Sequence, residues 1–106
     1  MTENEIQKAI ETILYKYIDR STTAVFLFGS RAGGFGDSTA DYDIGLFRGQ
    51  PIDGATLAHI KADMEESHIP VPVDIVDFAS LPEDFKQIAL QKTQIWNQPK
   101  NGIKIS

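Results

Sequence analysis

Residues 24–47 read AVFLFGSRAGGFGDSTADYDIGLF, and this stretch decides the fold. Its first part, Ala24–Phe28, is an apolar run that ends at a glycine, which is typical of a strand buried on both faces. A second apolar run, YDIGLF at 42–47, predicts a neighbouring strand. Between them, Arg31–Ala40 contains three glycines and little periodicity. We therefore expect a short helical turn after the first strand, followed by a loop.

The junction after the first strand is suited to an anion. Gly29 lets a ligand approach the backbone closely, because it carries no side chain. Ser30 adds a hydroxyl and a backbone N–H that can donate to the same ligand. Arg31 supplies a cation, which either contacts a phosphate or pairs with Asp19 or Asp37 at the surface.

Two aspartates stand at the start of the second run, and ten residues separate Ser30 from Asp41. Alternate residues of a strand share a face, so Asp41 and Asp43 are expected to project side by side, with Gly45 leaving space beside them. Adjacent carboxylates repel each other unless a cation neutralises them. Mg²⁺ takes oxygen ligands of this kind, and Mn²⁺ accepts them as well.

A third acid interrupts the apolar run VPVDIVDF at 71–78. A carboxylate in such a run needs a hydrogen-bonding partner or a metal, which points to Asp74. A shift of one residue in the strand register would make Asp77 the inward acid instead. If this strand lies beside the one that carries the first two aspartates, three carboxylates converge near the glycine-serine turn. That geometry is typical of two-metal phosphoryl or nucleotidyl transfer.

The pattern resembles the nucleotidyltransferase superfamily of DNA polymerase beta, and most closely its minimal nucleotidyltransferases. Their pattern is Gly-Ser, a ten-residue spacer, Asp-x-Asp and a later Asp, and the resemblance spans roughly residues 25–96. The chain departs from it twice. The family often reads GSRARG, whereas this chain lacks the second arginine, which would stand directly before Gly34. In addition, Ala40 stands where the family often has serine. The matching positions are Gly29, Ser30, Asp41, Asp43 and Asp74.

The resemblance implies a Mg²⁺-dependent enzyme that transfers AMP from ATP to a hydroxyl group. The Asp-x-Asp pair would hold the metals, the later aspartate would complete the second metal site and help to deprotonate the acceptor, and the glycine-serine turn would seat the β and γ phosphates. The implied catalytic and metal-binding residues are Asp41, Asp43 and Asp74, and the implied nucleotide-binding residues are Gly29, Ser30 and Arg31.

Proteins of this kind often occur with a small helical HEPN-domain protein as toxin–antitoxin pairs. The resemblance therefore implies that the chain is an antitoxin that adenylylates a tyrosine of a HEPN-domain toxin, within a hetero-oligomer. Two other functions stay open. One is an antitoxin with a weak or inactive site that acts by contact alone, and the other is the nucleotide-binding subunit of a two-chain enzyme that modifies a small molecule.

Length and composition narrow the choice of function. With 106 residues we expect a single domain at 1–97 and a polar tail at 98–106. The net charge of −5 argues against direct nucleic-acid binding, which needs a basic patch. The chain has no cysteine, and its start lacks the positive region and apolar run of a secretory signal, so we expect a cytoplasmic protein without a membrane segment.

The periodic segments predict an α/β (α+β) fold, a small mixed sheet covered by helices on one face with the carboxylates on the other. Capping boxes at Thr2 with Glu5 and at Ser80 with Glu83 predict helix starts. The first helix is expected to end near residue 19 and the last near residue 93, with Phe85, Ile88 and Ala89 facing inward. A middle helix carries Leu57, Ile60 and Met64, the third strand begins at Val73, and Ile95 and Trp96 form an edge strand or a packing tail.

Overall fold

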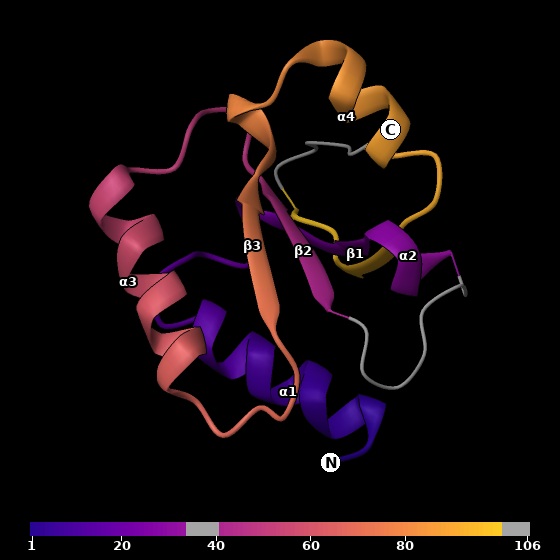
Figure 1. The fold of residues 1–106 in the computed structure, drawn as a ribbon. Helices are drawn as coiled ribbons and strands as arrows, with labels where there is room; N and C mark the ends of the chain where they lie inside the picture. Colours follow the sequence, from indigo (N-terminus) through magenta and orange to yellow (C-terminus); the bar gives the residue numbers. More distant parts are fainter. Residues whose placement is uncertain (34–40, 101–106) are drawn as a thin grey trace.

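A computed structural model describes residues 1–33 and 41–100 of the chain. A four-stranded sheet lies at its centre, with helices on both sides (Figure 1). The elements in chain order are α1 (Glu3–Leu14), β1 (Ala24–Phe28), α2 (Gly29–Ala32), β2 (Tyr42–Phe47), α3 (Gly54–Glu66), β3 (Val73–Asp77), the 3₁₀ turn η1 (Phe78–Ser80), α4 (Glu83–Ala89) and β4 (Gln94–Asn97).

The sheet has the strand order β3-β2-β1-β4. β1 pairs antiparallel with both β2 and β4, whereas β2 and β3 pair in parallel. The parallel pair requires a crossover, and α3 supplies it between the two strands. The predicted mixed sheet, the start of β3 at Val73 and the edge strand at the chain's C-terminal side are all confirmed.

One face of the sheet carries the larger core. α1 and α3 lie against it, because their apolar side chains recur at helical spacing. The buried residues of this core come from α1 (Ile6, Ile10, Leu14), α3 (Ile60, Met64), the strands (Val25, Leu27, Tyr42, Ile44, Leu46, Ile75) and the β2–α3 connection (Ile52).

No helix in the described part of the chain has the length and apolar character that crossing a membrane requires.

The first helix begins as predicted but ends earlier. Thr2 and Glu5 form the capping box, with the Glu5 backbone N–H donating to the Thr2 hydroxyl at 3.2 Å. The helix stops at Leu14 and not near residue 19. The next N–H groups, of Lys16 and Tyr17, bond to carbonyl groups only three residues earlier, so the chain tightens into turns there.

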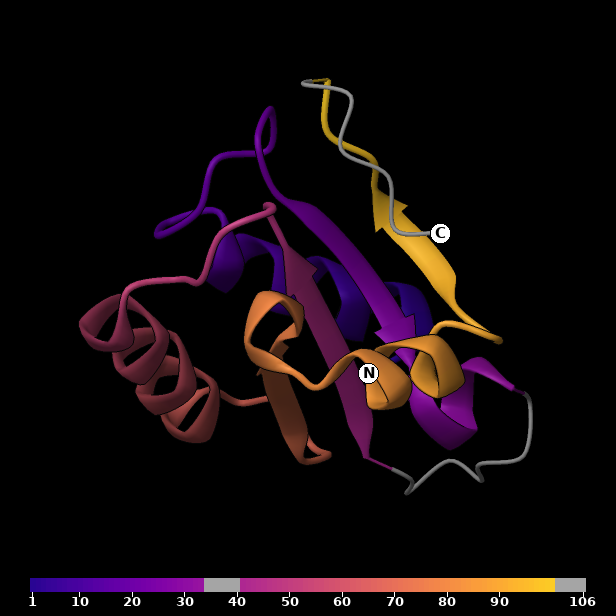
Figure 2. The same cartoon turned by 90° about the horizontal axis from the view of Figure 1, so that it is seen from above.

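The opposite face carries a smaller aromatic core. Phe26, Phe28 and Phe78 pack edge to face or tilted, with ring centroids 4.7–6.2 Å apart. The short helix α4 lies over this part of the sheet, on the side away from α1 (Figure 2). The helical cover of one face is thus confirmed for α1 and α3, while α4 adds a partial cover on the other face.

Three predictions about α4 are wrong. Ser80 does not cap the helix, because its hydroxyl donates to the Asp77 carboxylate at 3.1 Å and Pro82 occupies the N-cap without a side-chain bond. Phe85 and Ile88 do not face inward, since they are 50% and 69% exposed. The helix is held to the sheet by its last turn, chiefly Ala89 and Leu90, and it also ends before residue 93.

Candidate active site

Two of the three predicted carboxylates lie on directly paired residues. Asp43 of β2 is opposite Asp74 of β3 in the parallel register, so both side chains leave the same face of the sheet. That face is the one away from α1 and α3, because the alternate residues Tyr42 and Ile44 belong to the core under those helices. Asp41 is exposed and immediately precedes β2.

The three carboxylates influence one another electrostatically. The pKa of Asp43 is raised, first by partial burial and then by the negative charges of Asp74 and Asp41. Each of these effects disfavours the ionised form of Asp43. A bound cation would remove this repulsion between the carboxylates, so the charges on this face favour the binding of a positive ligand.

A metal ion is the ligand that this donor set suits best. Carboxylate oxygens on a half-buried strand face are typical ligands of hard divalent cations. Within residues 1–33 and 41–100, however, no three acidic or histidine side chains lie close enough to form a complete metal site as they stand. The residues therefore fit a divalent ion by their chemistry and their shared face, and side-chain rotation would be needed to bring the oxygens together.

The glycine-serine turn lies against these acids. β1 ends at Phe28, and Gly29 has a φ of +77°, a left-handed conformation that other residues rarely adopt. A β-carbon on Gly29 would collide with the Asp43 carboxylate and would lie 3.1 Å from its Cγ atom. The backbone of the turn can therefore approach Asp43 only because this residue is glycine. Ser30 follows it, exposed, in the first turn of α2.

Arg31 makes contacts on the other face of the sheet. Its guanidinium carbon lies 4.1 Å from the centre of the Tyr42 ring, and its Nη1 atom lies 3.6 Å from a carboxylate oxygen of Glu3. Arg31 thus forms an ion pair, the predicted alternative to a phosphate contact, and its partner is Glu3. Asp19 instead accepts bonds from Ser21. The other suggested partner, at position 37, lies outside the described residues.

Asp77 has a structural environment. It is 7% exposed and lies three residues after Asp74, on the face that α1 and α3 cover. Its carboxylate accepts from the Ile52 backbone N–H at 2.9 Å, from the Ser80 hydroxyl at 3.1 Å and from the Ala79 backbone N–H at 3.3 Å. The register therefore places Asp74, and not Asp77, beside Asp43.

The expected space at Gly45 is absent. A β-carbon there would overlap the Phe26 ring and would come within 2.8 Å of the Phe78 ring. The absence of a side chain at Gly45 thus allows the Phe26 and Phe78 rings to pack on the sheet. The predicted open space beside the carboxylates is filled by these two rings. The prediction failed because the partners of Gly45 come from β1 and η1, which no local pattern reveals.

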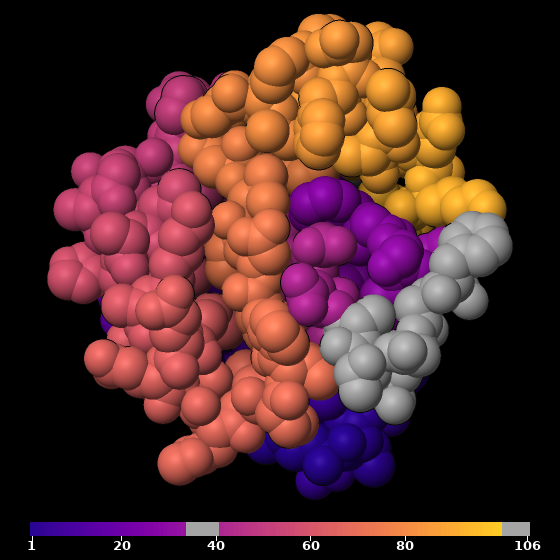
Figure 3. Space-filling model, viewed as in Figure 1, coloured from indigo at the N-terminus to yellow at the C-terminus, as the bar shows by residue number. Residues whose placement is uncertain are grey.

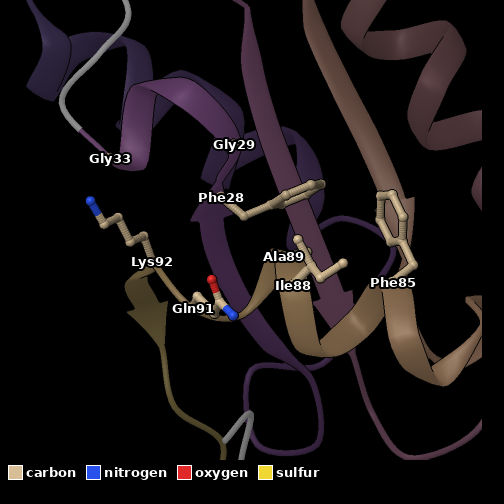
Figure 4. A pocket seen from close by; sticks show the side chains of 8 residues that line it. All are labelled: Phe28, Gly29, Gly33, Phe85, Ile88, Ala89, Gln91 and Lys92. Atoms are coloured by element: carbon tan, nitrogen blue, oxygen red, sulfur yellow. The ribbon is translucent and has the colours of Figure 1, made fainter.

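A pocket of about 380 Å³ lies between α2 and α4 (Figure 4). It reaches the glycine-serine turn, because Gly29 and Gly33 line one side of it. Sequence reasoning missed its other residues, among them Gln91 and Lys92, because no motif marks them and the position of α4 is set by tertiary packing. In the space-filling view the recess around the turn is visible between β3, α4 and the chain that follows α4 (Figure 3). Positions 34 and 40 lie outside the described residues, whereas Gly33, which stands in place of the second arginine of the family pattern, lines the pocket.

The two histidines take no part in this site. His59 lies on α3, where its ring stacks on Tyr17 with centroids 6.3 Å apart, and His68 follows the same helix, exposed. Both therefore belong to the side of the molecule away from the carboxylates.

Sequence comparison identifies related proteins. A family model described as "Polymerase beta, Nucleotidyltransferase" matches residues 8–101 of the chain. A Haemophilus influenzae protein named "Probable protein adenylyltransferase MntA" is 32% identical over 91 residues, which make up 86% of this chain and 77% of that protein. Both matches include the glycine-serine turn and all three aspartates.

Solved structures of similar fold come from toxin–antitoxin complexes. One is described as a toxin–antitoxin with AMP-PNP; its matched chain is 22% identical with a TM-score of 0.68, over 95% of this chain and 77% of that one. Another is described as a tri-AMPylated Shewanella oneidensis HEPN toxin in complex with MNT antitoxin; it is 18% identical with a TM-score of 0.68, over 92% of this chain and 74% of that one. At these identities the likeness is one of fold.

Proposed function

Because the chain belongs to the polymerase beta nucleotidyltransferase family, we propose that it transfers AMP from ATP to a hydroxyl group of a partner protein. The observation that carries this proposal is the paired register of Asp43 and Asp74 against the Gly29 turn. The name of the Haemophilus relative, a protein adenylyltransferase, supports AMP as the transferred group and a protein as the acceptor.

Asp41, Asp43 and Asp74 would hold the divalent ions, with Mg²⁺ as the expected metal. When bound, these ions neutralise the triphosphate and draw charge from the leaving pyrophosphate. Gly29 and Ser30 would donate backbone N–H groups and a hydroxyl to the β and γ phosphate oxygens. The close packing of this turn on Asp43 places the phosphate subsite next to that carboxylate.

The transfer itself is an in-line displacement. The acceptor hydroxyl oxygen forms a bond to the α-phosphorus while the bond from that phosphorus to the bridging oxygen breaks. Pyrophosphate leaves with the electron pair. The hydroxyl proton passes to Asp74, which is exposed at the surface of β3 and can therefore meet an incoming acceptor.

The proposed acceptor is a tyrosine of a HEPN-domain toxin, and the proposed assembly is a hetero-oligomer with that toxin. The fold is shared with a chain of a complex between an MNT antitoxin and a HEPN toxin that is described as tri-AMPylated, which supports this partner. A single domain, which the length of the chain predicts, would offer one sheet face for the nucleotide and little further surface to enclose an acceptor. A partner that brings its own hydroxyl to Asp74 fits this shape.

A labelling experiment tests the proposal. The chain and its copurifying partner are incubated with Mg²⁺ and ATP labelled at either the α or the γ phosphate. We expect label on the partner from α-labelled ATP alone, and loss of labelling in Asp43→Asn and Asp74→Asn. Glu66→Gln is the control, because it removes one negative charge from the exposed end of α3 on the opposite face.

Other results would point to other functions. Label from γ-labelled ATP would indicate phosphoryl transfer. Tight partner binding without any labelling would favour neutralisation by contact, and labelling of a small molecule in place of the partner would favour a two-chain enzyme.

A further inference from the structure

The pocket between α2 and α4 has an unusual wall. Phe85 and Ile88 of α4 line it, yet they are 50% and 69% exposed, so the chain leaves large apolar side chains uncovered at this place. Phe28 of β1 supplies a third apolar wall. Flat aromatic and aliphatic surfaces around a small cavity suit the face of a planar ring, and the volume of about 380 Å³ lies within the range of small-molecule sites.

The polarity of the pocket changes from one end to the other. Figure 4 shows the apolar side chains of α4 at one end, and Gln91 and Lys92 at the other, with the Lys92 ammonium directed toward Gly33. A nucleotide has the same order of properties, with an apolar ring at one end and anionic phosphates at the other. The Gln91 amide offers a donor and an acceptor together, which is the pair that the edge of a purine base requires.

The pocket is continuous with the proposed phosphate subsite. Gly29 lines the pocket and also packs on the Asp43 carboxylate, so a ligand in the pocket would lie against the same turn that borders the carboxylates. Lys92 beside Gly33 places a positive charge where the chain lacks the second arginine of the GSRARG pattern.

We propose that this pocket is the nucleobase subsite of the enzyme. Phe85 and Ile88 hold the faces of the base, the Gln91 amide reads its edge, and Lys92 attracts the phosphates toward α2. The inference rests on the proposed function, because it assumes a nucleoside triphosphate at the glycine-serine turn. It extends that function by assigning base recognition to α4 and to the residues that follow it.

Binding measurements separate the base from the phosphates. Isothermal titration with Mg²⁺ compares ATP with inorganic tripolyphosphate, which lacks the base and the ribose. For Phe85→Ser we expect ATP binding to weaken by about tenfold while tripolyphosphate binding stays unchanged, since stacking contacts are lost. Ile95→Ser is the matched control: Ile95 is 54% exposed and does not line the pocket, so both affinities should equal those of the wild type.

A second variant tests base reading. Gln91→Leu should reduce the preference between ATP and GTP and leave tripolyphosphate binding intact, because the exposed side chain loses its amide while keeping its size. An unchanged ratio of the ATP and GTP affinities would contradict the role of Gln91.

Three outcomes overturn the inference. Equal weakening of ATP and tripolyphosphate in Phe85→Ser would place phosphates, and not a base, against α4. Unchanged ATP affinity combined with lost partner binding would make the pocket a protein docking surface. Unchanged ATP affinity and intact partner binding would leave the pocket without either role. If the wild type binds neither ATP nor tripolyphosphate, the proposed function fails together with this subsite. If the wild type binds both ligands and Phe85→Ser gives one of the three results above, only the assignment of the nucleobase subsite fails.

Discussion

Replacing Gly29 with alanine should damage the site and the fold to different degrees. The residue has a φ of +77°, and the left-handed region costs an L-residue about 1–2 kcal/mol. Stability in a domain of this size changes by about 4–8 °C in Tm for each kcal/mol. Gly29→Ala should therefore lower Tm by roughly 4–16 °C and still fold.

The effect on activity should be larger. The new β-carbon would collide with the Asp43 carboxylate, and its nearest carbon neighbours, Cγ and Cβ of Asp43, lie at 3.1 and 3.3 Å. Because the backbone of Asp43 is held in a strand that is paired on both sides, its side chain has to rotate away from the Gly29 turn. A displacement of about 1 Å in a reacting group can lower a rate by about 100-fold, so AMP transfer should fall by at least that order.

Gly54→Ala is the matched control. Gly54 is the first residue of α3, and a β-carbon there meets nothing within 4 Å. It should leave AMP transfer unchanged and raise the free energy of unfolding by about 0.4–1 kcal/mol, because alanine restricts the unfolded chain. Thermal unfolding and labelling with α-labelled ATP measure both quantities. A Gly29→Ala protein with wild-type Tm and wild-type transfer would refute the reasoning.

Three further predictions concern the core. Gly45→Ala should destabilise the protein by about 1–3 kcal/mol in urea unfolding, because the added methyl group overlaps the Phe26 ring; an unchanged midpoint would contradict the packing. Asp77→Ala should cost about 1–3 kcal/mol, since it removes the acceptor of the buried Ile52 N–H, whereas Asp77→Asn keeps an acceptor and should cost less. Burial, and then the charge of a neighbouring glutamate, raise the pKa of Tyr15 from 10.0 to about 12, so the folded state favours the neutral phenol. The contribution of Tyr15 to the free energy of unfolding should therefore be complete below pH 10 and should be lost as the pH rises toward 12. Urea unfolding of Tyr15→Phe should show a smaller loss of the free energy of unfolding between pH 10 and pH 12 than that of the wild type.

Much of the site could be predicted because its parts follow local rules. The alternation of β2 fixes the face of Asp43, and the strand–helix–strand order around α3 favours a parallel neighbour that brings Asp74 beside it. Glycine at position 29 was expected to allow a close approach, and the structure shows that Asp43 is the group that comes close.

The remaining features depend on contacts between distant segments. The inward face of α4 was mispredicted, because only its last turn reaches the sheet and Phe85 is left half exposed. The role of Asp77 depends on the Ile52 N–H, 25 residues away. The position of Arg31 depends on Tyr42 and Glu3 from two other elements. None of these partners could be read from spacing within one segment.

The most direct test of the central claim is the intact mass of the proposed HEPN-domain partner after incubation with the chain, ATP and Mg²⁺. We expect mass increases of one adenylyl group for each modified tyrosine, and their absence with Asp43→Asn, which should retain the wild-type Tm and partner binding. Adenylylation that persists with Asp43→Asn, or a bound partner whose mass never changes while the chain binds ATP, would contradict the claim.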